Sequence, residues 1–141
     1  TDKSVQREYE RIDFYSYVVH IVQRLLNPKQ GGKRKGILVF TRFLKEAEKL
    51  TWSIPGCAIV SGETPKKERE QILEAFKSGR IPVVANVGVL TTGFDYPELD
   101  TVVMARPTMS LAMSAGQFVR IRLKNQVGLL TYVEISNDLG K

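Results

Sequence analysis

Short apolar runs alternate along this chain with segments that have the residue spacing of amphipathic helices. The runs lack the polar alternation of a half-exposed strand, so we expect strands that are buried on both faces. Buried strands joined by helices pair in parallel through right-handed crossovers. The sequence therefore predicts an α/β fold, a single three-layer domain with a mostly parallel sheet and helices on both faces. The expected strands cover 36–40, 58–60, 81–87, 101–105 and 127–135.

Local end signals locate the helices between these strands. Asn27-Pro28 ends the first helix, because the residue before a proline avoids helical backbone. Thr64 is a candidate N-cap for the third helix, with Pro65 as its first residue and Ser78-Gly79 closing it. The expected helices cover 8–26, 44–52, 65–77 and 110–123.

Composition bounds the class of protein. The chain has 141 residues, of which 43% are apolar and 26% charged, as in a globular domain. Its net charge of +6 favours a polyanionic partner. One cysteine, Cys57, and one histidine, His20, can form neither an internal disulfide nor a Cys/His metal site. No apolar run is long enough for a membrane span or a signal peptide. We expect a cytoplasmic protein without a membrane partner or a metal site.

The segment 87–97 carries the most specific chemistry. It leads from an apolar run into Thr91, Thr92 and Gly93, where a glycine lets backbone N–H groups approach an anion closely. Asp95 can accept hydrogen bonds from a sugar hydroxyl. The segment predicts a site for phosphate and ribose at a strand end. An ordinary strand-to-loop turn is the alternative, because glycine, aspartate and proline are common in turns.

Polar residues also follow two other predicted strands. Thr41-Arg42 comes after the first strand, and the sequence Ser-Gly-Glu-Thr at 61–64 comes after the second. The carboxyl ends of parallel strands share one edge of a sheet, where ligands bind in such folds. We therefore expect these two segments and 88–95 to lie along one rim, which strengthens the phosphate interpretation.

These blocks resemble, in content and order, the motifs of the second RecA-like lobe of superfamily-two helicases, closest to phage and bacterial duplex-unwinding members. The resemblance covers about 36–135, and we expect 1–35 to be an N-terminal helix with a basic connecting loop and 36–141 to be the RecA-like lobe. The matching blocks are 37–41 for motif IV, 61–64 with Arg69 for the block after it, 91–97 for motif V, and 106–110 for the approach to motif VI.

Motif VI departs from the family pattern Gln-x-x-Gly-Arg-x-x-Arg. This chain has Gln117, Arg120 and Arg122, but the glycine is missing and the block is shorter. On a helix, side chains two positions apart point about 200° away from each other. Only one of the two arginines can then face a nucleotide, unless the backbone here is not helical. Two solvated arginines near a helix end are the alternative.

The resemblance implies a role for each of these residues. Arg69 has an alternative, because its stem could simply cover the apolar face formed by Ile72 and Leu73. The implied catalytic residues are Gln117, Arg120 and Arg122; the implied nucleotide-binding residues are Gly93 and Asp95; and the implied nucleic-acid-binding residues are Thr41, Arg42, Gly62, Arg69, Thr91 and Thr92.

The sequence contains neither a Walker-type loop nor an acidic magnesium motif. The resemblance therefore implies ATP and Mg²⁺ only in a complete two-lobe protein, and none bound to this chain alone. The implied partners are a first RecA-like lobe and nucleic acid, with DNA favoured over RNA. We expect the second motor lobe of an ATP-dependent helicase or translocase. The alternative is a nucleic-acid-binding or regulatory module on the same fold that has lost ATP coupling.

Overall fold

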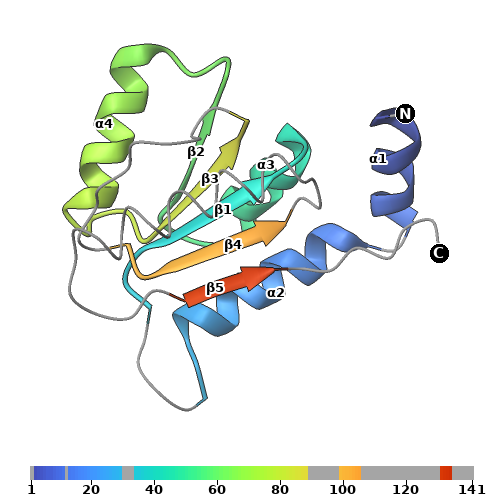
Figure 1. The fold of residues 1–141 in the computed structure, drawn as a ribbon, viewed down its shortest axis with the longest axis horizontal. Helices are drawn as coiled ribbons and strands as arrows, with labels where there is room; N and C mark the ends of the chain where they lie inside the picture. Colours follow the sequence, from blue (N-terminus) through green and yellow to red (C-terminus); the bar gives the residue numbers. More distant parts are fainter. Residues whose placement is uncertain (1, 12, 30–33, 89–98, 106–130, 135–141) are drawn as a thin grey trace.

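The fold is built on a parallel sheet with the strand order β2-β3-β1-β4-β5 (Figure 1). The computed structural model describes residues 2–11, 13–29, 34–88, 99–105 and 131–134. The central strand β1 is buried along its whole length, as expected in a parallel sheet that is covered on both faces. The strands are β1 Ile37–Thr41, β2 Cys57–Ser61, β3 Val83–Val87, β4 Thr101–Ala105 and β5 Thr131–Glu134.

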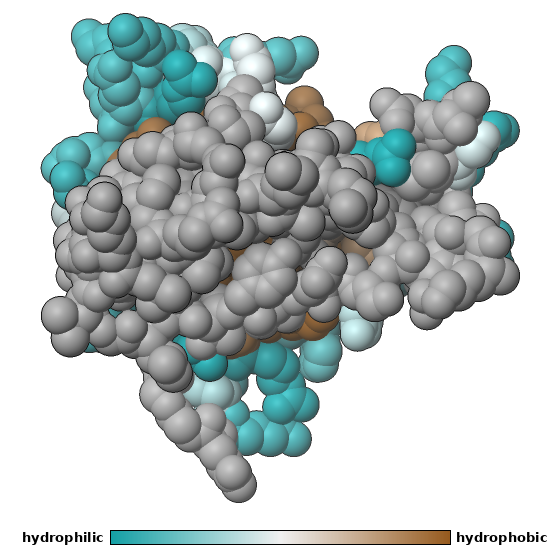
Figure 2. Space-filling view, in the orientation of Figure 1, coloured by the Kyte–Doolittle hydropathy of each residue, from teal (hydrophilic) through white to brown (hydrophobic). Residues whose placement is uncertain are grey.

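Helices cover both faces of the sheet, so the predicted three-layer α/β fold is confirmed. The predicted helix 110–123 lies outside the described residues. Figure 2 shows hydrophilic side chains gathered over α4, the outer layer on one side. The helices are α1 Asp2–Arg11, α2 Phe14–Leu26, α3 Leu44–Ser53 and α4 Lys66–Lys77.

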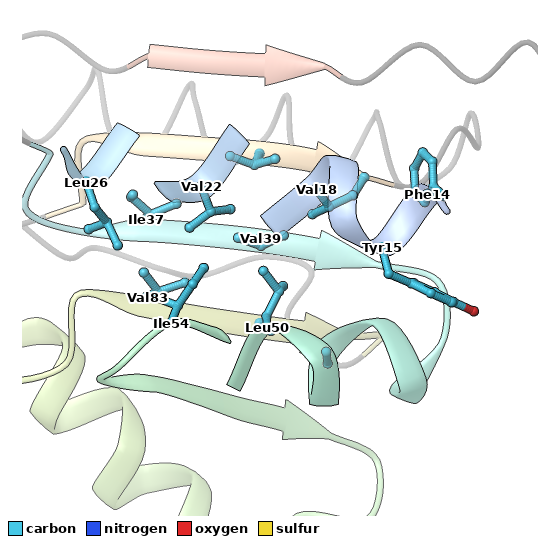
Figure 3. Close-up of a cluster of buried hydrophobic side chains, with 14 residues drawn as sticks. Phe14, Tyr15, Val18, Val22, Leu26, Ile37, Val39, Leu50, Ile54 and Val83 are labelled. Carbon is cyan, nitrogen blue, oxygen red and sulfur yellow. The ribbon is translucent and has the colours of Figure 1, made fainter. Parts of the chain in front are cut away.

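One core lies between the sheet and the helices α2 and α3 (Figure 3). Alternate strand residues point to this face, because successive side chains of a strand point to opposite sides. Val18 and Val22 of α2 and Leu50 of α3 are fully buried against Ile37 and Val39 of β1. The buried residues of α2 thus lie on one face, with the spacing of an amphipathic helix. The division of the chain at residue 35 stays a prediction.

The second core lies on the opposite face, under α4. Phe76 of α4 is 1% exposed and packs with Leu38 and Phe40, the β1 residues that alternate with the first set. Ile72 and Leu73 complete this contact, as the helical spacing predicted. The sheet is therefore buried on both sides, which explains why its strands have no polar face.

The single helix predicted over 8–26 is wrong. The chain breaks at Asp13, whose backbone is left-handed with φ 56° and ψ 46°, between α1 and α2. Aspartate tolerates this conformation better than most residues. The break lets α1 turn away from the axis of α2, and Glu10 of α1 forms an ion pair of 2.7 Å with Lys45 of α3. Periodicity cannot detect such a break, because both helices keep helical spacing.

Thr64 is not the N-cap of α4. Pro65 is the residue before the first helical turn, and the Thr64 hydroxyl accepts a hydrogen bond from the Ser61 N–H at 3.0 Å. Threonine hydroxyls compete in this way between helix capping and local turns. The end of α4 agrees with the prediction, since Ser78 is its C-cap and Gly79 follows with φ +85°.

Candidate functional site

The carboxyl ends of β1, β2 and β3 lie at one level. Phe40 of β1 and Val60 of β2 are both in register with Asn86 of β3. The next residues, Thr41 and Ser61, therefore end their strands on either side of β3, about 10 Å apart given the usual strand spacing. The rim predicted from the sequence exists for these described segments.

Thr41 is fully buried at this rim. Its hydroxyl donates a hydrogen bond of 3.4 Å to the backbone carbonyl of Asn86. This bond ties the end of β1 to the end of β3 beyond the last backbone pairing. The structure thus gives the Thr41 side chain a positioning task, and its contact with nucleic acid stays a prediction.

Arg42 lies directly after β1 and is half-buried. Its guanidinium stacks over the ring of Phe43, with 5.4 Å between the guanidinium carbon and the ring centre. The Glu46 carboxylate, only 2% exposed, accepts a hydrogen bond of 3.1 Å from the Phe43 N–H and so caps the start of α3. The backbone that presents Arg42 is therefore held on both sides, by β1 and by α3.

The turn 61–64 follows β2 at the same edge. Three hydrogen bonds close it: the Ser61 N–H donates to the Thr64 hydroxyl, the Glu63 N–H to the Ser61 hydroxyl at 3.2 Å, and the Thr64 N–H to the Ser61 carbonyl at 3.1 Å. Gly62 is exposed at the tip. The two hydroxyls are used inside the turn, so its shape is fixed and Gly62 presents backbone to solvent.

Arg69 lies in the first turn of α4, which starts from this edge. Its N–H donates to the Pro65 carbonyl at 2.9 Å, and its side chain is half-buried. Exposed Lys66 and Lys67 lie in the same turn, where Glu68 and, beside it, Glu63 and Glu70 are exposed as well. The surface beside the 61–64 turn therefore carries charges of both signs. The structure does not decide between the binding role of Arg69 and packing of its stem on the apolar face.

The third polar segment is described only at its beginning. The chain leaves β3 at Val87 and turns at Gly88, which is exposed and has φ +77°. A positive φ here favours glycine, so a glycine at this strand end has a backbone reason. The remaining predicted site residues, Thr91, Thr92, Gly93, Asp95, Gln117, Arg120 and Arg122, lie outside the described residues.

Two residues that shape the rim were missed by sequence reasoning. Glu46 caps α3, and the signal for it was a glutamate three positions after the residue that precedes the helix. Asn86 is fully buried in the middle of the sheet and interrupts an apolar run. A buried amide in a central strand needs hydrogen-bond partners, and this could have marked the strand end as special.

Neither a metal centre nor a membrane span is found in the described part of the chain. Within residues 2–11, 13–29, 34–88, 99–105 and 131–134, no three His, Cys, Asp or Glu side chains are grouped as metal ligands would be. In the same ranges, every helix is too short or too polar to cross a bilayer.

Comparison with known proteins agrees with this geometry. Residues 17–122 match the family described as helicase conserved C-terminal domain. A 51.5 kDa protein of a Lactococcus phage (isolate 7-9) is 39% identical over 61 residues, which are 43% of this chain and 14% of that protein. ATP-dependent RNA helicase DBP3 of Gibberella zeae is 34% identical over 88 residues, which are 59% of this chain and 15% of that protein.

A solved structure shares the fold. The helicase domain of Hef from Pyrococcus furiosus superposes with a TM-score of 0.65 at 24% identity, covering 96% of this chain and 29% of that chain. The chain thus spans less than a third of the length of each of these three proteins. The family match extends over most of the sequence, from α2 past β4. The chain therefore belongs to the helicase conserved C-terminal domain family.

Proposed function

We propose that this chain is the second motor lobe of an ATP-dependent helicase or translocase and holds the backbone of one nucleic-acid strand. The observation that carries the proposal is the shared level of the β1 and β2 ends, which sets Arg42 and the turn at Gly62 on one rim. The strand ends next to them, Thr41 and Ser61, lie about 10 Å apart, which corresponds to about three nucleotide steps at the B-form rise of about 3.4 Å per strand. A single strand can therefore contact both.

The chemistry of this rim suits contacts to phosphates. Arg42 offers a guanidinium whose position is restrained by Phe43, and Gly62 allows close approach of backbone. Phosphate contacts carry no sequence information, which suits a motor that acts on any sequence. Among the described residues, Arg69 is the third proposed contact to the nucleic-acid strand. Thr41 holds the rim in place through its bond to Asn86. Thr91 and Thr92 are proposed to extend them.

The nucleotide side of the proposal follows the family motifs. Gly93 and Asp95 would face the ribose, and Gln117 with Arg120 or Arg122 would face the γ-phosphate. ATP with Mg²⁺ would be held mainly by a first RecA-like lobe and would supply the free energy of phosphoryl transfer. Closure of the two lobes around ATP and their reopening would change the grip on the strand.

DNA stays our proposed substrate, although one relative is named an RNA helicase. The proposed contacts are to the nucleic-acid backbone, and a cytoplasmic location is part of the same proposal. Titration of this chain with a labelled single-stranded DNA and with the RNA of the same sequence tests the choice. Tighter binding of RNA at equal salt would reverse it.

The strand-holding role is tested by Arg42→Gln. Loss of one phosphate contact should weaken oligonucleotide binding several-fold and reduce the slope of log affinity against log salt by about one. Lys77→Gln, in the last turn of α4 and remote from the carboxyl edge, is the matched charge control. Equal affinities and equal slopes for Arg42→Gln and the original chain would contradict the proposed grip.

The motor role is tested in the complete two-lobe protein. Asp95→Ala should leave the melting temperature nearly unchanged and abolish ATP-dependent strand separation, because a ribose contact is lost rather than a structural bond. A variant that melts early yet unwinds normally, after correction for the folded fraction, would show Asp95 to be a turn residue. Strand binding without any ATP-dependent unwinding by the unmutated protein would favour the ATP-uncoupled module instead.

A further inference from the structure

A second surface of this lobe lies on the outer side of α2 and α3. Both helices run from the carboxyl edge of the sheet to its amino edge, because each leads into a parallel strand. They pack side by side over the same core (Figure 3). Two hollows, of about 550 and 540 Å³, open along their outer sides and share His20, Gln23 and Ser53. We call this continuous depression the α2/α3 groove.

In the described part of the chain, the charged side chains that line the groove are all positive. Lys49 lines the hollow that also contains Trp52, and Arg24 lines the other hollow. Among the described residues that line the two hollows, none is an aspartate or a glutamate. The other polar lining residues are amides, hydroxyls and the imidazole of His20, and they include Gln23 and Ser53, which can donate hydrogen bonds. The lining therefore complements an anion and lacks a group that would repel one.

Trp52 stands exposed in the same hollow as Lys49. Its side chain is 72% exposed, whereas a tryptophan that packs in a core is mostly buried. Lys49 is held next to it, with its ammonium 4.9 Å from the centre of the Tyr15 ring. The groove thus combines a free aromatic face with a positioned positive charge.

We propose that the α2/α3 groove binds single-stranded nucleic acid, with a base stacked on Trp52 and phosphates paired with Lys49 and Arg24. Proteins that bind single strands without sequence preference combine a basic groove and an aromatic platform in this way. The ten residues of α3 extend about 15 Å, which suits two to four nucleotides. This surface is separate from the carboxyl-edge grip at Arg42 and Gly62, and its proposal does not depend on that grip.

Trp52 also provides the test, because it is the only tryptophan in the chain. Its fluorescence should be quenched by a dT or rU oligonucleotide of twelve bases, since a stacked base lies against the indole. Inorganic polyphosphate at equal charge should not quench it. The quenching midpoint should be unchanged in Lys77→Gln, the charge control on α4.

Two sets of variants examine the contacts themselves. Lys49→Gln combined with Arg24→Gln should raise the midpoint several-fold and reduce the salt slope by about 1.4, which is about 0.7 for each phosphate contact to a single strand. Trp52→Ala, measured by the anisotropy of a labelled oligonucleotide in an Arg42→Gln background, should weaken binding about tenfold. Circular dichroism melting confirms that each variant is folded at the assay temperature.

Three results would overturn the proposal. The first is unchanged Trp52 fluorescence at oligonucleotide concentrations that saturate anisotropy. The second is equal quenching by polyphosphate, which would make the groove a site for simple anions. The third is an unchanged midpoint in the folded Lys49→Gln, Arg24→Gln variant. Failure of quenching, with oligonucleotide binding still weakened by Arg42→Gln, would reject the groove as a site and leave the proposed carboxyl-edge grip standing.

Discussion

The carboxylate of Asp100 accepts a hydrogen bond of 2.8 Å from the backbone N–H of Lys35, 65 positions earlier in the chain. The same carboxylate accepts bonds from the Gly36 N–H at 3.4 Å and from the Thr101 hydroxyl at 3.0 Å. In return, the Asp100 and Thr101 N–H groups donate to the Gly36 carbonyl. Asp100 therefore fastens the amino ends of β1 and β4, opposite the edge that carries the proposed grip.

Asp100→Ala should lower the free energy of unfolding by about 1–3 kcal/mol, because three donors lose a charged acceptor. Asp100→Asn should cost less, since it keeps one acceptor oxygen. Urea unfolding followed by circular dichroism measures both, with the exposed Glu70→Ala on α4 as control. A loss no larger than that of Glu70→Ala would show that the fastening is not important for stability.

Gly56 and Gly79 form a matched pair for the cost of adding a Cβ atom. Both have positive φ, +83° and +85°, but a Cβ at Gly56 would lie 3.0 Å from Cδ of Pro82, whereas Gly79 has nothing within 4 Å. Gly79→Ala should cost about 1 kcal/mol for the backbone alone. Gly56→Ala should cost about 1 kcal/mol more, because the proline ring cannot yield easily. Equal losses in thermal or urea unfolding would contradict the close approach.

The Cys57 thiol is expected to be unreactive in the folded protein. Burial raises its pKa from 9.0 to about 12, against a smaller lowering by the Ala85 backbone, and the thiolate is the form that reacts. Alkylation by iodoacetamide at pH 8 should be much slower than after unfolding in urea. Alkylation at the rate of a free thiol would contradict the burial.

The same pKa shift predicts a pH dependence of stability. Between pH 9 and about 12 the folded state keeps the thiol proton that the unfolded state releases, so stability falls as pH rises through this window. Below pH 9 this contribution is fully present. Cys57→Ala should show a shallower loss across the window than the original chain. Parallel curves for the two proteins would show that Cys57 does not contribute.

Thr41→Val should lower the free energy of unfolding by about 1 kcal/mol, because the Asn86 carbonyl loses its buried hydroxyl donor. Thr41→Ser keeps the hydroxyl donor, so it should retain the hydrogen bond to Asn86 and lose only the contribution of the methyl group to the free energy of unfolding. Urea unfolding compares the two variants. If Thr41→Val left stability unchanged but reduced oligonucleotide affinity, the hydroxyl would bind the nucleic acid rather than the Asn86 carbonyl.

Much of this fold was predictable because its signals are local. The apolar runs of β1 and β4, the proline after α2 and the Ser78-Gly79 end of α4 each act within a few residues. Strands buried on both faces allow few arrangements other than a parallel sheet. The same logic predicted that Arg42 and Gly62 share an edge, since parallel strands place all their carboxyl ends together.

The sequence by itself therefore determined the strands, their parallel pairing and the edge that the ends of β1 and β2 share. Only the tertiary structure decided the break at Asp13, the use of the Thr64 hydroxyl within the 61–64 turn and the α2/α3 groove beside Trp52. The groove depends on how α2 packs beside α3, and the other two depend on which of several local conformations the folded chain selects. The periodicity of apolar residues shows which face of a segment can be buried. It does not show which other segment packs against that face or where the backbone breaks.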